Sequence, residues 1–149
     1  MSKEFRHIVR VIDTDVDGTL KAAYALRKVK GISINLANAI LRKAGVDPEV
    51  RIGVLSEEQV DKIEDVINNP SKYGIPSWLL NRRKDLETGK DLHLISSDLV
   101  LRTKMDIELM KKIKCWKGYR HAHGLKVRGQ RTRTTGRKGK TVGVSKKRR

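Results

Sequence analysis

The stretch Ser33-Ile-Asn-Leu-Ala-Asn-Ala-Ile-Leu-Arg-Lys-Ala-Gly45 carries the clearest structural signal in the sequence. Its apolar residues recur at intervals of three and four, which places them on one face of a helix: Leu36, Ala37, Ile40, Leu41 and Ala44. Ser33 or Asn35 can cap the start of this helix, and Gly45 ends it. The stretch therefore predicts an amphipathic helix that packs one face into a core.

Two similar segments lie on either side of this one. Residues 20–29 are mostly good helix formers with apolar positions at helical spacing, and Gly31 ends them. Further on, Ser56 and Gln59 form the pattern of a capping box, and an apolar stripe follows over residues 60–67. We expect the facing stripes of three or four short helices to form a modest core.

We expect the chain as a whole to be mostly α-helical and to consist of four parts. A small helical domain spans residues 1–69 and starts with a short extended segment at residues 5–12. A loop-rich insertion follows at 70–98. A long helix and its junction occupy 99–117, with an apolar stripe at every fourth position: Leu101, Met105, Leu109 and Ile113. Residues 118–149 are predicted to form an extended basic tail.

Charge is distributed very unevenly along the 149 residues. The formal net charge is +17, yet residues 1–108 hold 18 Lys and Arg against 17 Asp and Glu. The last 41 residues hold the other 16 cationic side chains and no acidic one. The like charges of such a segment repel one another, so it cannot stay compact unless a polyanion neutralises it. Because the tail has almost no apolar face for lipid, nucleic acid is the expected partner and a membrane is not.

Aromatic and cationic side chains alternate at the start of the tail, a pattern that suits stacking on unpaired bases beside phosphate contacts. Arginine forks at intervals of two or three residues fit successive phosphates, and Thr and Gln add hydrogen bonds. The predicted RNA-binding residues of this region are Trp116, Tyr119, Arg120, His121, Lys126, Arg128, Gln130, Arg131, Arg133, Arg137, Lys138, Lys140, Lys146 and Lys147.

A second candidate contact is the glycine turn around Lys30 and Gly31, which joins two predicted helices. A hairpin of this kind can point free amide groups at a phosphate, with lysines alongside. The spacing fits equally well a glycine helix terminator flanked by solvated lysines, so both interpretations stay open.

The sequence also contains an incomplete match to a calcium-binding loop, whose ligand spacing it does not satisfy. Asp13, Asp15 and Asp17 imitate the start of a calcium loop, but Tyr24 stands where the closing carboxylate belongs. We expect Asp17 instead to cap a helix that starts near Thr19.

Phosphate-loop, metal and catalytic sites are also excluded. Residues 136–141 lack the leading glycine of a phosphate-binding loop. Cys115, His121 and His123 lack a fourth metal ligand, and the single cysteine allows no internal disulfide. No catalytic group, metal or cofactor is predicted.

One long string is more specific than composition. Residues 124–137, GLKVRGQRTRTTGR, follow GYRH at 118–121, and together they resemble the signature of the S-thirteen family of small-subunit ribosomal proteins. The resemblance covers nearly the whole chain, including residues 11–20, 30–32, 44–47 and 55–59. The stretch at 75–85 and the ending at 141–147 look like the archaeal and eukaryotic branch.

The resemblance implies a cytoplasmic structural constituent of the small ribosomal subunit and no enzyme. It also implies a fold of the helix-two-turn-helix type for the amino-terminal helical domain. It implies contacts with rRNA in the subunit head and with the nineteenth small-subunit protein. It also implies intersubunit bridges to large-subunit rRNA and the fifth large-subunit protein, and a tail near peptidyl-site tRNA. A basic architectural DNA-binding protein is the alternative that shares the charge.

Overall fold

The structure is a computed structural model that describes residues 5–135 and residue 143. The contacts within the chain divide it into two compact units, Met1–Arg102 and Thr103–Arg149. Helices dominate the described residues, which confirms the predicted mostly-α class. The finer division into four parts stays a prediction.

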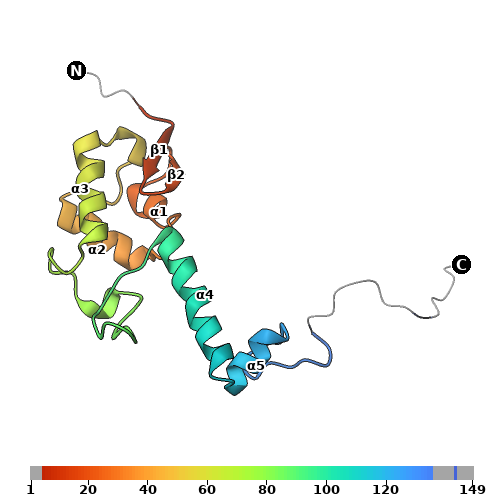
Figure 1. The fold of residues 1–149 in the computed structure, drawn as a ribbon. Helices are drawn as coiled ribbons and strands as arrows, with labels where there is room; N and C mark the ends of the chain where they lie inside the picture. The colour runs from red at the N-terminus through yellow and green to blue at the C-terminus, as the bar shows by residue number, and fades with distance from the viewer. Residues whose placement is uncertain (1–4, 136–142, 144–149) are drawn as a thin grey trace, which may run out of the picture. The chain divides into compact units, whose positions relative to one another are not determined.

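The first unit begins with a β-hairpin (Figure 1), of which only the first strand was expected. β1 (Ile8–Val11) pairs antiparallel with β2 (Thr14–Asp17), with Val9 opposite Val16. Val9, Val11 and Val16 are buried, so alternate residues of both strands face the core. The backbone N–H of Ile12, in the turn, donates to Glu64 Oε1 at 2.6 Å and so ties the hairpin to a helix that follows later.

The first helix is shorter than expected and begins later. α1 spans Ala22–Leu26, and its N-cap residue is Lys21. The prediction that Asp17 caps this helix is therefore wrong. The Asp17 carboxylate instead accepts hydrogen bonds from the backbone N–H and the hydroxyl of Thr19, at 2.8 and 2.7 Å. It stabilises the turn between β2 and α1, a role that short acidic side chains commonly fill.

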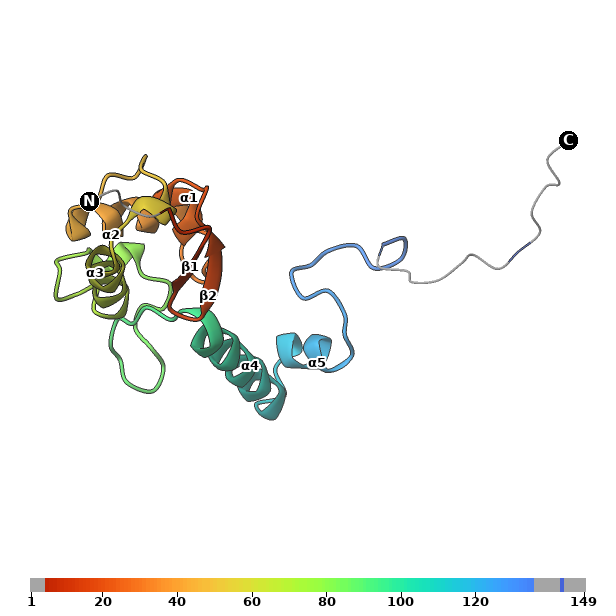
Figure 2. The same ribbon diagram turned by 90° about the horizontal axis from the view of Figure 1, so that it is seen from above.

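Two longer helices complete the core. α2 (Ile34–Ala44) is capped by Ser33, whose side chain accepts from the backbone N–H of Leu36, and Gly45 is its C-cap. α3 (Glu57–Asn68) has the predicted capping box. Figure 2 shows α2 and α3 on one side of the first unit and the hairpin on the other. The predicted stripes face inward, and the largest fully buried side chains include Leu36, Ile40, Leu41, Ile63, Val66 and Ile67.

The predicted insertion is an ordered loop closed by a bridge between Arg82 and Leu92. It contains one 3₁₀ turn, η2 (Ser77–Leu79). Inside it lies Asp85, which is 3% exposed and accepts hydrogen bonds from the side chains of Arg82 and Arg102. The bridge and the buried carboxylate fix the loop without any long helix or strand of its own.

α4 spans Ser96–Lys112 and starts in the first unit. The apolar stripe predicted on this helix exists but is not part of the core, since Leu101, Met105, Leu109 and Ile113 are all exposed. α5 (Trp116–Ala122) follows at once. The prediction of extended chain from residue 118 is thus wrong for residues 118–122, which are helical.

Candidate nucleic-acid interface

A tight corner between α4 and α5 positions the aromatic start of the predicted tail. Lys114, just before α5, has a φ of 56°, in the left-handed region. The Cys115 thiol then caps α5 by accepting from the backbone N–H of Gly118 at 3.4 Å. Gly118 packs so closely that an added Cβ would lie 2.1 Å from the Met110 carbonyl oxygen. The corner therefore depends on a glycine at that position.

Three aromatic side chains form a continuous row along α5. The rings of Trp116 and Tyr119 are stacked, with centroids 5.7 Å apart and planes 8° from parallel. The ring of His123 lies 4.2 Å from that of Tyr119. Spacings of three and four residues bring side chains together on one helix face. Trp116 stays 70% exposed and Tyr119 50%, so the row presents ring surface to solvent.

Arg120 links this row to the chain that follows. Its guanidinium lies 5.6 Å from the centre of the Trp116 ring, within the range of a cation–π interaction. Its Nε also donates to the backbone carbonyl of Lys126 at 3.0 Å. The Lys126 ammonium in turn donates to the Thr135 hydroxyl at 3.2 Å. These contacts fold residues 123–135 back on themselves without a helix or strand.

Most predicted RNA-binding side chains in the described part of the tail face solvent. The exposed ones are Trp116, Tyr119, Lys126, Arg128, Gln130, Arg131 and Arg133, while Arg120 and His121 are half-buried. Five others lie outside the described residues: Arg137, Lys138, Lys140, Lys146 and Lys147. An exposed cationic surface without acidic neighbours in sequence is suited to phosphate binding.

The glycine turn at residues 30–31 is packed against the insertion, a contact that its spacing in the sequence did not predict. Gly31 has a φ of 103°, and a Cβ there would lie 2.6 Å from the carbonyl oxygen of Leu94. The backbone N–H of Ser96 donates to the Lys30 carbonyl at 2.9 Å. The insertion thus covers this turn. The Lys30 side chain remains exposed and belongs to the first unit, whereas the aromatic row belongs to the second.

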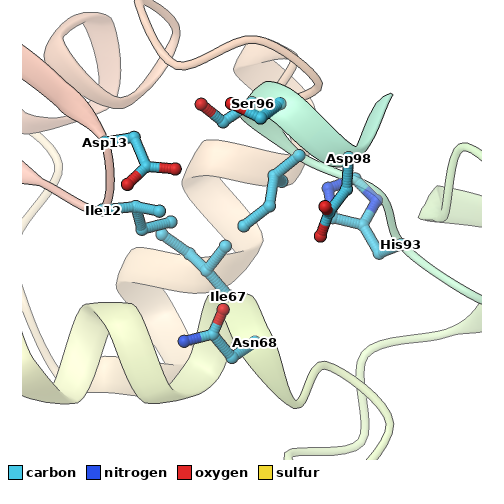
Figure 3. A pocket seen from close by; sticks show the side chains of 9 residues that line it. Ile12, Asp13, Ile67, Asn68, His93, Ser96 and Asp98 are labelled. Carbon is cyan, nitrogen blue, oxygen red and sulfur yellow. The ribbon is translucent and has the colours of Figure 1, made fainter. Parts of the chain in front are cut away.

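A cavity of about 280 Å³ in the first unit had no counterpart in the sequence analysis. Figure 3 shows its wall, which is formed by Ile12 and Asp13 of the hairpin turn, by Ile67 and Asn68 at the end of α3, and by His93 and residues 95–98. Exposed carboxylates of Asp13 and Asp98 line it, and these would repel a phosphate.

His93 lines this cavity and is half-buried. Burial lowers the pKa of its imidazole, and its Nδ1 accepts from the backbone N–H of Asn81 at 3.4 Å. A neutral ring that accepts at Nδ1 carries its proton on Nε2. That Nε2 has no hydrogen-bond partner among the described residues. No local pattern around His93 marks it in the sequence, because the cavity is made by segments far apart in the chain.

Within the described ranges, 5–135 and 143, no three His, Cys, Asp or Glu side chains gather as a metal site would require. Cys115 is a free thiol that caps α5. In the same ranges no helix combines the length and the apolar character that crossing a membrane requires.

Comparison with known proteins shows the family to which the chain is similar. Residues 10–138 match the family described as "Ribosomal protein S13/S18". The chain is 60% identical over 148 residues to "Small ribosomal subunit protein uS13" of Staphylothermus marinus, covering 99% of this chain and 98% of that protein. It is 58% identical to the protein of the same name from Pyrobaculum islandicum, covering 99% and 95%. For Saccharolobus solfataricus the identity is 56%, covering 99% and 89%.

Proposed function

This chain belongs to the ribosomal protein S13/S18 family, and we propose that within the small ribosomal subunit it holds rRNA mainly through residues 116–149. Members of this family are structural ribosomal proteins, not enzymes. The archaeal relatives all carry the name of a small-subunit protein.

The observation that carries the proposal is the aromatic row beside an uninterrupted run of cationic side chains. Trp116 and Tyr119 offer exposed ring surface on which unpaired bases can stack. After Glu108 the sequence contains no acidic residue, so nothing offsets the attraction of its lysines and arginines for phosphate. Stacking selects unpaired bases, and the cationic run supplies affinity that does not depend on sequence.

The near-neutral first unit is proposed to contact proteins and the intersubunit bridges. Because its net charge is close to zero, the first unit as a whole has little electrostatic attraction for RNA, in contrast to the tail. The nineteenth small-subunit protein, the fifth large-subunit protein and large-subunit rRNA are proposed as its partners, and peptidyl-site tRNA as a partner of the tail. These assignments rest on the family resemblance. Lys30 remains a candidate RNA contact through its exposed side chain alone.

The salt dependence of rRNA binding tests the proposal. If the tail neutralises about eight phosphates, the logarithm of the association constant should fall against the logarithm of salt concentration with a slope near −6 to −7. The full chain and purified small-subunit rRNA are titrated by filter binding at several salt concentrations. A slope no steeper than about −2 contradicts a tail that works by neutralising phosphates.

Duplex DNA of matched length serves as the control polyanion. A small-subunit protein should prefer structured rRNA at every salt concentration, because stacking requires unpaired bases. Equal affinity for the duplex would instead favour the architectural DNA-binding alternative.

A further inference from the structure

The insertion between α3 and α4 presents an exposed tryptophan and two adjacent cationic side chains. We propose that residues 76–92 form a second RNA-binding surface, in which Trp78 stacks on an unpaired base while Arg83 and Lys84 contact phosphates. This surface lies in the first unit and goes beyond the proposed role of residues 116–149.

Trp78 faces solvent because its neighbours anchor the turn that carries it. η2 is closed by hydrogen bonds from Leu79 N–H to the Pro76 carbonyl and from Leu80 N–H to the Ser77 carbonyl. Leu80 is buried and Leu79 packs against the core. With these two leucines directed inward, Trp78 is left 68% exposed. A large ring held in this position is available for stacking without any rearrangement of the turn.

The acidic side chains within residues 76–92 are all engaged in contacts of the first unit. The Asp85 carboxylate is paired with Arg82 and Arg102, and Glu87 accepts from Arg102 at 2.7 Å. Asp91 accepts from the backbone N–H of Lys84 at 2.8 Å. The remaining cations have no side-chain hydrogen bond or ion pair with any part of the chain that the structure describes: Arg83, Lys84 and Lys90. Residues 76–92 thus keep their carboxylates occupied and present exposed cationic side chains that are not paired with them.

The backbone that carries Arg83 and Lys84 is held in an unusual conformation. Lys84 has a φ of 50°, which costs a non-glycine residue about 1 kcal/mol or more. The contact with Asp91 and the bridge between Arg82 and Leu92 hold it there. Asn81 adds a clamp, because its side chain both donates to and accepts from the backbone of Leu94. A surface fixed in this way loses little conformational entropy when a partner binds.

Charge complementarity favours RNA over a protein as the partner. Surfaces that bind proteins are depleted of lysine at their centre. An exposed aromatic ring with arginine and lysine a few residues away is instead typical of contacts to unpaired nucleotides. The exposed cations here lie five and six residues after Trp78, on the same fixed segment.

The two tryptophans of the chain allow a direct test, since the sequence contains no others. In the Trp116→Phe variant, fluorescence reports on Trp78 alone; in Trp78→Phe, it reports on Trp116 alone. Each full-length variant is titrated to saturation with purified small-subunit rRNA, with occupancy followed separately by filter binding. We expect both tryptophans to be quenched on binding, because each stacks on a base.

The charge contribution is tested with the double variant Arg83→Gln/Lys84→Gln. Loss of two phosphate contacts should make the salt slope shallower by about 1.4 to 1.8. The matched control is Arg42→Gln/Lys62→Gln, which removes the same charge from exposed positions on α2 and α3. The control should leave the slope within error of that of the unmodified chain.

The outcomes separate this proposal from the role of the tail. If rRNA quenches Trp116 but leaves Trp78 unchanged, the inference about the insertion fails and the tail's role stands. If rRNA quenches only Trp78, the inference about the insertion stands and the proposed role of the tail fails. A Trp78 response that appears only after ribosomal proteins are added to the rRNA identifies a protein-binding surface and overturns the proposal. Equal slope changes in the two double variants overturn the phosphate contacts of Arg83 and Lys84.

Discussion

Every buried apolar side chain among the described residues lies before residue 81, whereas between residues 103 and 135 only Gly118 is buried. The first unit can therefore fold by removing apolar surface from water, with no partner required. The later segment has only local devices: a thiol cap, a close glycine contact and stacked rings. If the segment binds rRNA as proposed, neutralisation by that polyanion would supply much of its stability.

The largest expected effect is a test of this contrast with two leucines. Leu41 on α2 is fully buried at 0% exposure, and Leu101 on α4 is 59% exposed. Leu41→Ala should lower the free energy of unfolding of the first unit by about 2–5 kcal/mol, because a cavity replaces packed methyl groups. Leu101→Ala removes the same atoms from an exposed site and should change it by no more than about 0.5 kcal/mol. Urea denaturation followed by circular dichroism measures both.

The Leu101 variant is the more informative of the two if the result is unexpected. A loss equal to that of Leu41→Ala in the free chain would mean that the apolar stripe of α4 is covered in solution. Leu101 lies at the end of the first unit, and its stripe continues along α4 into the later segment. Burial would then extend well beyond residue 81, and the contrast between the two regions would fail.

A smaller effect is expected from Gly118→Ala, which should act on the second region alone. The added methyl group would lie against the Met110 carbonyl, and overpacking of this kind costs about 1–3 kcal/mol. We expect faster hydrogen exchange of the α5 amides and weaker rRNA binding, with an unchanged denaturation midpoint for the first unit.

Gly143→Ala is the matched control for this substitution, because a Cβ at that position meets nothing within 4 Å. It should leave hydrogen exchange in α5 unchanged. If Gly118→Ala also leaves α5 unchanged, the corner does not depend on the close approach of the two backbones.

Local signals made the helices of the core predictable. The capping box at Ser56 and the stripes of α2 and α3 act over three or four residues, and the structure places them as expected. The stripe of α4 shows the limit of such patterns. Periodicity tells which face of a helix is apolar, but what covers that face depends on other segments. For Leu101 and Met105, the described part of this chain leaves that face exposed.

Features that depend on distant partners were missed. β2 contains Asp15 and Asp17, which are unfavourable in strands, and it forms because it pairs with β1 and buries Val16. The tail was expected to be extended from residue 118, yet Gly118 lies inside α5, where only a glycine allows the contact with Met110. The aromatic and cationic composition of residues 116–133 predicted an RNA-binding surface without this geometry.

The buried carboxylate of the insertion was missed for the same reason. Asp85 is paired with Arg102, seventeen residues further along the chain. Nothing near either residue in the sequence marks the pair, because only the folded insertion brings the two side chains together.

The smallest effect, absent at neutral pH, concerns the acid stability of the first unit. Hydrogen bonds from Arg82, and then from Arg102 and Thr88, hold the pKa of Asp85 well below its usual range. The Tyr73 hydroxyl, with Asn69, likewise lowers the pKa of Asp65. A carboxyl group with a lower pKa in the folded state binds fewer protons there than in the unfolded chain. Its contribution to stability is complete above about pH 4 and is lost as the pH falls further.

His93 produces an earlier and separate loss. Because burial lowers its pKa, protonation favours the unfolded chain, and stability should begin to fall below about pH 6.5. The carboxylates add a steeper fall below about pH 4. No acidic residue follows Glu108, so this steeper step should come from the first region of the chain and not from its tail.

The Asp85→Asn variant measures how much of the stability loss below about pH 4 comes from the insertion. Between pH 5 and about pH 2.5, the number of protons taken up on unfolding should fall, by at most about one, relative to the unmodified chain. Asp61→Asn is the control, because the exposed Asp61 side chain on α3 has no hydrogen-bond partner among the described residues, and its slope should match that of the unmodified chain. Urea denaturation at a series of pH values gives both slopes. Identical acid slopes for Asp85→Asn and the unmodified chain would mean that the insertion opens before the rest of the first unit unfolds. The rigid surface that presents Arg83 and Lys84 would then lack its main support, and the contrast between a self-sufficient first unit and a dependent tail would have to be redrawn inside the first unit.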